Sequence, residues 1–290
     1  MNLTLCSPQL FDRQAGPVLR RQEVEYSLML GIARQLLEDP SRYPGDNLQL
    51  TVMQDDRLLL AAVRTPPHKL LLYTDGDQPE AMRLLAAWLL RHSPSIPGVL
   101  ALDNVAADWA RLWRELTGAT ATLMQSIRLH VLEQVTDAAH PTGHARWATQ
   151  GDAPLLREWI VAFHEQAVPH SPPPAPDRLL ERNIGHDRLM VWEDGGETVS
   201  MAMLTRPTGN CLGVGLVYTP ASLRRHSYAT ALVAELSRRG LAQGYRYCSL
   251  YTDLANPISN SIYRKIGYRP VSDWSDYFFS YATSEETHAE

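Results

Sequence analysis

Apolar positions recur along the chain with either a helical or an alternating period, and these periods predict the secondary structure. Helical spacing predicts a helix over 21–38, which ends at Pro40. The apolar runs LQLTVMQ and LLLAAVR follow, separated by the turn letters DDR, and HKLLLYT comes after a Pro-Pro turn. Short apolar runs between turn residues are typical of antiparallel strands, so we expect three strands here.

The remaining elements of the first half recur in a similar order in the second half. The first half continues with helices at 79–91 and 104–116, a strand at 98–102 between them, and a strand pair across 119–133. For the second half we expect a strand at 144–149, helices at 152–167 and 176–184, strands at 188–193, 197–206 and 211–219, a helix at 225–243, the strand YRYCSLYT, a helix at 257–266 and a last strand region to 282. Gly118, Gly244 and Gly267 stand where helices commonly end. The repetition predicts two domains of one architecture.

Length and composition agree with two globular domains. The chain has 290 residues, and a domain usually takes about 100 to 200. Hydrophobic residues make up 44% and charged residues 20%, which excludes disordered and fibrous proteins. The formal charge of −5 comes from 27 basic and 32 acidic residues. We therefore expect neither nucleic acid nor membrane as a partner.

The cysteines and the start of the chain favour a cytoplasmic protein. Cys6, Cys211 and Cys248 lie far apart without a CxxC pair, as expected of buried thiols in a reducing compartment. No stretch of 18 apolar residues occurs, and MNLTLCSPQLFDRQ lacks the pattern of a cleaved leader.

Three segments outside these elements have distinctive compositions. Residues 135–144 (VTDAAHPTGH) are expected to link the two domains. Residues 168–177 hold five prolines and predict a stiff extended loop. Residues 283–290 (TSEETHAE) predict an acidic tail.

One stretch of the second half combines a strand, a loop and a helix in the way that phosphate sites require. The strand GVGLVYTP leads through ASLRRHSYA into the helix TALVAELSRRGLAQG. A helix N-terminus offers unpaired N–H groups and a positive dipole end to a pyrophosphate, and Arg224, Arg225 and His226 add positive charge. The alternative is that these side chains are solvated charges at a helix start.

The stretch YTPASLRRHSYATALVAEL, followed by LYTDLANPISNSIYRKIGYRPV, resembles the acetyl-CoA signature of the GNAT acetyltransferase superfamily. The phosphate-loop pattern of that family is matched at Arg224 and Ala229, but Ser227 stands where glycine is usual. The resemblance implies an α/β (mixed α+β) fold with two tandem GNAT-like domains, each a mostly antiparallel mixed sheet flanked by helices. It places a degenerate domain at 1–134, a linker at 135–144 and the acetyl-CoA-binding domain at 145–282.

The resemblance also assigns roles to residues in that second domain. The main chain of Val217, Tyr218 and Thr219 is expected to pair with the pantetheine arm, and Gly213 and Gly215 to form a bulge there. The pyrophosphate is expected at Arg224, Arg225, His226, Ser227, Tyr228, Ala229 and Thr230. Asn256 is expected to bind the pantetheine amides.

Tyr263 is the expected general acid for the departing thiolate. It lies seven residues after Asn256, which puts both side chains on one helix face. An alternative is an aromatic side chain that only packs under the last strand. Asp253 is the first candidate for a base, ahead of Glu165 and His170, and it is equally typical of a turn or helix cap. The strand at 211–219 has no glutamate.

The first half lacks the residues of such a site. Asp75 and Asp77 follow its third strand and would repel a pyrophosphate. When the helix ends at Gly118 and Gly267 are aligned, the two residues opposite Tyr263 and Asn256 are an arginine and an alanine, Arg114 and Ala107. We therefore expect no cofactor in this half.

These observations predict an acetyltransferase that moves the acetyl group of acetyl-CoA, a co-substrate, directly to a primary amine of a small molecule or peptide. The alternative is a non-catalytic acyl-CoA-binding sensor or an interaction module. His140 and His144 have helical ligand spacing but no third partner in sequence, so we expect no metal. The acceptor and the oligomeric state stay open.

Overall fold

The computed structural model describes residues 1–136 and 140–282. The chain divides into two compact units: unit 1 comprises Met1–Gln22, Met29–Ile127 and the chain from Ser272, and unit 2 comprises Glu23–Leu28 and Arg128–Val271. In the part of the chain that the structure describes, no helix is both long enough and apolar enough to cross a membrane.

Unit 1 is a mixed sheet with helices on it. Its elements are β1 (Asn2–Leu5), α1 (Pro8–Gln14), α2 (Gly16–Leu19), a 3-10 turn (Arg20–Gln22), most of α3 (Ser27–Glu38), β2 (Leu48–Gln54), β3 (Arg57–Arg64), β4 (Leu70–Thr74), α4 (Pro79–His92), β5 (Gly98–Leu102), α5 (Asp103–Thr117), the start of β6 (Thr120–Leu132) and most of β12 (Arg269–Ser280). The strand order is β1-β2-β3-β4-β5-β12. The β4–β5 pair is parallel and the others are antiparallel.

The core of unit 1 lies between this sheet and helices α4 and α5. Leu60 and Ala62 lie two residues apart on β3, so their side chains point to the same face of the sheet. On that face they belong to one core with Trp109 and Trp113 of α5. Both indole rings are fully buried and stack at 5.7 Å between centroids. These two tryptophans are therefore core residues, and they stabilise unit 1 rather than bind a ligand.

Unit 2 has a similar order of elements. They are β7 (His144–Trp147), a 3-10 turn (Gln150–Asp152), α6 (Ala153–Ala167), α7 (Pro176–Asn183), β8 (Leu189–Asp194), β9 (Glu197–Thr205), β10 (Cys211–Tyr218), a 3-10 turn (Ala221–Leu223), α8 (Tyr228–Ala242), β11 (Tyr247–Asp253) and α9 (Pro257–Ile266). With the second part of β6, the strand order is β6-β11-β10-β9-β8-β7. Strands β7 to β10 pair antiparallel, and β10 pairs parallel with β11.

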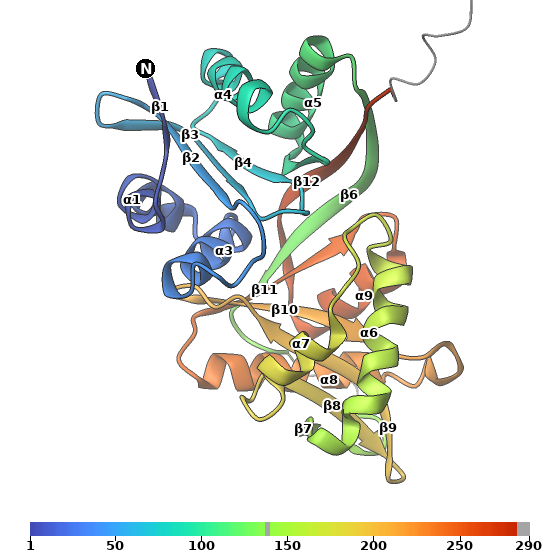
Figure 1. Ribbon diagram of the computed structural model, residues 1–290. Coiled ribbons are helices and arrows are strands. Elements are labelled where there is room, and N and C mark those ends of the chain that lie inside the picture. Colours follow the sequence, from blue (N-terminus) through green and yellow to red (C-terminus); the bar gives the residue numbers. More distant parts are fainter. Residues whose placement is uncertain (137–139, 283–290) are drawn as a thin grey trace, which may run out of the picture. The chain divides into compact units, whose positions relative to one another are not determined.

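Helices cover both faces of the unit 2 sheet (Figure 1). On one face, Met190 and Trp192 of β8 pack in a core with α8 and α9. On the other face, Leu189 and Val191 pack in a core with α6 and α7. This alternation along one strand produces a three-layer arrangement, because both faces of the sheet are apolar.

Most of the expected element positions agree with the structure and three differ, whereas β1, α1 and α2 were not expected from the sequence. The expected strand pair across 119–133 is one continuous strand, β6. The expected helix at 21–38 starts as an α-helix only at Ser27, after a 3-10 turn. The helix expected from 225 begins at Tyr228, because Arg225 and Ser227 adopt left-handed backbone angles that an α-helix excludes.

One strand in each unit's sheet comes from the segment that follows the last helix of the other unit. Residues 274–278 of β12 follow α9 but pair antiparallel with β5 of unit 1, with Trp274 opposite Leu102. From Arg128 onward, β6 follows α5 but belongs to unit 2, beside β11. The compact units thus divide the chain differently from the expected domains 1–134 and 145–282. The expected acidic tail and the middle of the expected linker, 137–139, lie outside the described residues.

Candidate functional site

The strands β10 and β11 are paired only over their first residues. Cys211, Leu212 and Gly213 lie opposite residues 247–249, whereas both strands continue for several residues beyond that ladder. The edge of β10 that faces β11 is therefore open from Val214 onward in the described chain. An open edge presents main-chain N–H and C=O groups that an extended ligand can pair with.

A β-bulge at Leu216 directs the end of β10. The register with β9 shifts between Gly215 and Tyr218, and Leu216 has a positive φ of 53°. Leu212 and Val214 pack in the core under α8, but Leu216 packs in the opposite core under α6. The bulge thus reverses which side chains face α8. The expected bulge is present, and its left-handed residue is a leucine, Leu216, directly after the second expected glycine, Gly215.

The loop after β10 ends in a tight turn at the N-terminus of α8. Arg225 and Ser227 have φ values of 70° and 63°, so both are left-handed. Ser227 makes no side-chain cap, and the N–H of Ala231 bonds the carbonyl of Ser227. The preceding N–H groups, of residues 228–230, are left without helix partners, as at any helix start. Together with the dipole of this 15-residue helix they suit a negatively charged group.

Arg224 is held on the loop and on α6. Its Nε donates to the carbonyl of Thr219 at 3.0 Å, and Nη2 donates to Oε1 of Gln166 at 2.6 Å. Ser200 of β9 bonds the same part of the chain, since its hydroxyl donates to the carbonyl of Tyr218 at 3.0 Å and lies 2.9 Å from Oγ1 of Thr219. The carbonyls of Tyr218 and Thr219 therefore already have side-chain partners.

Tyr228, the first residue of α8, is bound to the end of β8. Its hydroxyl donates to Oδ2 of Asp194 at 2.6 Å, and Thr142 donates to the same oxygen at 2.7 Å. The hydrogen bond from Tyr228 is the main cause that lowers the pKa of Asp194. The ring of His226 stacks on Tyr228 at 5.5 Å and 18° between planes.

The side chains of α9 differ in exposure. Asn256 is exposed and caps the helix, with its side-chain oxygen accepting the N–H of Ser259 at 3.1 Å. Tyr263, two turns on, is 8% exposed within the core under α8. Burial raises the pKa of Tyr263 to about 12, so its hydroxyl keeps its proton at neutral pH. Asn260 bonds Thr252 at 2.6 Å and thereby joins α9 to β11.

The expected base, Asp253, occupies the turn after β11. Its Oδ1 accepts the N–H of Ala255 at 2.8 Å, a typical bond of a turn aspartate. On the other side of the sheet, the ring nitrogen Nε2 of His164 lies 2.9 Å from the carbonyl of Ser171 and so attaches the proline-rich loop to α6. The base thus stays a prediction, as does every assigned role of a site residue.

Sequence reasoning missed four side chains that shape this region: Thr142, Gln166, Asp194 and Ser200. None lies within the phosphate-loop or α9 motifs, and all are brought there by strand pairing or by helix packing. Asp194 had one local signal, since it ends a strand before the turn Gly-Gly that forms the β8–β9 hairpin.

Unit 1 has a different arrangement at the corresponding loop. Asp75, directly after β4, forms an ion pair with Arg57 at 2.8 Å, and its carbonyl accepts a bond from Gln78 at 2.8 Å. The helix α4 then starts at Pro79, which has no N–H to offer. The expectation that this half holds no cofactor stays a prediction.

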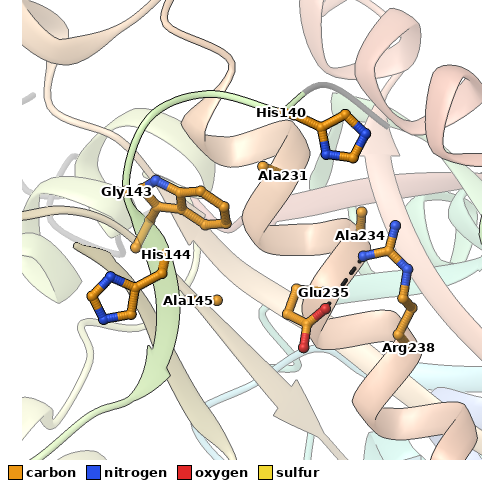
Figure 2. Close-up of a pocket in the computed structure, with 9 residues that line it drawn as sticks. His140, Gly143, His144, Ala145, Ala231, Ala234, Glu235 and Arg238 are labelled. Atoms are coloured by element: carbon orange, nitrogen blue, oxygen red, sulfur yellow. Dashed lines mark hydrogen bonds and ion pairs between the residues drawn. The ribbon is translucent and has the colours of Figure 1, made fainter. Parts of the chain in front are cut away.

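A cavity of about 360 Å³ lies elsewhere in unit 2, between α8 and the segment that leads into β7. Figure 2 shows its lining, with Ala231, Ala234, Glu235 and Arg238 along one side of the helix and the segment with His140 and His144 opposite. Glu235 pairs with Arg238 at 3.3 Å and with Arg239 at 2.8 Å. The residues at the β10–β11 opening do not line it. Within residues 1–136 and 140–282, no group of three or more His, Cys, Asp or Glu side chains is placed to hold a metal.

Comparison with known proteins gives a family match over part of the chain and a shared fold over nearly all of it. Residues 153–268 match the family model described as the acetyltransferase (GNAT) family. A GCN5-related N-acetyltransferase from Sphaerobacter thermophilus has a TM-score of 0.66 at 16% identity, covering 95% of this chain and 94% of that one. A Drosophila protein has a TM-score of 0.70 at 14% identity over 96% of this chain and 98% of its own. No curated protein matches the sequence.

The likeness extends over both halves of the chain. A tandem GNAT protein from the clavulanic acid biosynthesis pathway has a TM-score of 0.58 at 13% identity, covering 96% of this chain and 98% of that one. The mixed α/β fold with mostly antiparallel sheets is thereby confirmed, and so is the tandem GNAT-like arrangement.

Proposed function

We propose, from the GNAT-family domain that residues 153–268 form, that this protein transfers the acetyl group of acetyl-CoA to a primary amine. The observation that carries the proposal is the opening between β10 and β11, which leads into a left-handed loop at the N-terminus of α8. An open strand edge next to an anion-binding helix start suits a ligand with an extended amide arm and a pyrophosphate.

The residues present fit that ligand. The N–H groups at the start of α8 would receive the pyrophosphate, assisted by Arg225 and His226. The open edge of β10, including the main chain of Val217, would pair with the pantetheine amides. Arg224 would first have to leave Gln166, because its guanidinium is bonded there. Asn256 and Asp253 keep the proposed roles of amide ligand and base.

Tyr263 is the proposed general acid. A phenol with a pKa of about 12 remains protonated at neutral pH and is available to donate to a departing thiolate. The amine must be neutral to attack, so it has to lose a proton to Asp253 or to water. Most of the rate gain is expected from holding the two reactants together in a desolvated site.

The test is release of free thiol from acetyl-CoA over a library of primary amines and peptides. We expect amine-dependent release by the wild type and a loss of at least about 100-fold in Tyr263→Phe. Tyr245→Phe removes a hydroxyl from a tyrosine before β11, outside the proposed site, and should leave release unchanged. Binding of acetyl-CoA without turnover on any acceptor would instead favour the sensor.

A further inference from the structure

The loop that leads into α8 contains two residues in an unfavourable backbone conformation. Arg225 and Ser227 both have positive φ, although each carries a Cβ that is disfavoured in the left-handed region. Such residues persist where neighbouring contacts impose the conformation. The side chain of Ser227 supplies no such contact, since it forms no cap, and the helix start contacts Ser227 through its carbonyl, which accepts the N–H of Ala231.

The residues on either side of Ser227 have contacts that lead to the end of β8. Oδ2 of Asp194 accepts hydrogen bonds from Tyr228 at 2.6 Å and from Thr142 at 2.7 Å. Tyr228 is only 9% exposed, so its ring and hydroxyl together fix the residue directly after Ser227. His226, the residue directly before Ser227, stacks on the same ring. The residues before and after Ser227 are thus both held by Tyr228: His226 stacks on its ring, and Tyr228 is itself the next residue. The hydroxyl of Tyr228 is in turn bonded to Asp194.

We propose that Asp194 is a positioning residue of the cofactor site, which holds loop 224–227 in its left-handed form through Tyr228. This inference rests on the proposed function for its role, since the loop is where acetyl-CoA would bind. A glycine at 227 would adopt the left-handed angles without strain. Ser227 would instead be held in them by the hydrogen bonds that Tyr228 and Thr142 donate to Asp194. Asp194 is not proposed to touch the ligand itself.

Four variants, three single and one double, separate this role from a general effect on folding. Asp194→Ala removes the acceptor, whereas Asp194→Asn keeps an oxygen that accepts from both hydroxyls. Tyr228→Phe keeps the ring stacked on His226 but deletes the hydroxyl. The double variant Asp194→Ala with Ser227→Gly lacks the Asp194 carboxylate, but it also lacks the backbone strain of Ser227, because a glycine adopts positive φ freely.

The first readout is acetyl-CoA binding by calorimetry, together with steady-state kinetics if turnover is found. We expect Asp194→Ala and Tyr228→Phe to bind about fivefold to tenfold more weakly, with KM raised and kcat at saturation unchanged. Asp194→Asn should stay within about twofold of wild type, and Ser227→Gly should restore most of the affinity that Asp194→Ala loses.

The second readout needs no ligand. Hydrogen exchange of a peptide covering 224–231 should be faster in Asp194→Ala and Tyr228→Phe than in the wild type, and slow again when Ser227→Gly is added. A peptide from α4 serves as the internal reference. Unchanged exchange in Asp194→Ala, or weakened binding that Ser227→Gly does not restore, would overturn the positioning role. A wild type that binds no acetyl-CoA would instead overturn the proposed function, and exchange alone would then decide whether Asp194 holds the loop.

Discussion

Tyr263 is fixed in place by Tyr268 through both its backbone and its ring. The N–H of Tyr268 donates to the carbonyl of Tyr263 at 3.0 Å, and the rings meet edge to face at 5.9 Å between centroids. Gly267, with a φ of 111°, makes the turn between them. Ser237 of α8 lies 2.8 Å from the hydroxyl of Tyr268. The end of α9 therefore sets the direction of the proposed acid.

Because Tyr263 is buried, we expect its hydroxyl to ionise at a higher pH than an exposed tyrosine would. Burial raises its pKa to about 12, above the value of about 10 expected when unfolded. The stability that the neutral phenol contributes is therefore complete below pH about 10 and is lost as the pH rises toward 12. In a phenolate absorbance titration, the difference between wild type and Tyr263→Phe should appear only near pH 12. A difference already at pH 10 would show that the ring is accessible to water.

Two neighbouring glycines of β10 should respond differently to substitution. A Cβ on Gly213 would lie 2.5 Å from Oγ1 and 2.9 Å from the carbonyl oxygen of Thr205. A Cβ on Gly215 would meet only Cγ2 of Thr205, at 3.8 Å. We expect Gly213→Ala to lower the free energy of unfolding by about 1–3 kcal/mol and Gly215→Ala to change it by less than about 1 kcal/mol. Urea unfolding measures both, and equal losses would refute the close approach at Gly213.

Asp152 should make unit 2 sensitive to acid. Its carboxylate accepts two bonds of 2.8 Å from Arg146, and the N–H of Thr149 at 2.7 Å. Burial opposes ionisation, but these bonds outweigh it and hold the pKa of Asp152 well below its usual range. The resulting stability is present above the unfolded pKa of about 4 and is lost as the pH falls below it.

Substitution of that carboxylate tests the same point. Asp152→Asn should cost about 2–4 kcal/mol in the free energy of unfolding at pH 7, and less at pH 3. The matched control is Asp177→Asn, whose exposed pair with Arg157 should contribute less than about 1 kcal/mol. Similar losses for the two variants in thermal unfolding would contradict the account.

The sequence predicted most of the elements because their signals are local. The helices at α4, α5, α6, α7 and α9 agree with the expected ranges within two residues, and Gly118 and Gly267 end α5 and α9 as expected. The partner of the last strand was not predictable in this way. The residues of β12 are apolar enough for either sheet, and their pairing with β5 depends on contacts between segments more than 150 residues apart.

The candidate site could be proposed in outline from the sequence for the same reason. Arg224, Ser227, Asn256 and Tyr263 lie in motifs that can be read along the chain. Their surroundings were not predictable. Strand pairing and helix packing bring Gln166 to Arg224, and Asp194 to Tyr228, and neither contact leaves a spacing pattern in the sequence.

The most direct test of the central claim is a calorimetric titration of the whole chain with acetyl-CoA. We expect one site per chain, because Asp75 and Asp77 occupy the equivalent loop of unit 1. Binding should be lost in Arg224→Glu and retained in Arg114→Glu, a variant at an exposed arginine of α5. Two sites per chain, or equal affinity in wild type and Arg224→Glu, would contradict a single cofactor site at the N-terminus of α8.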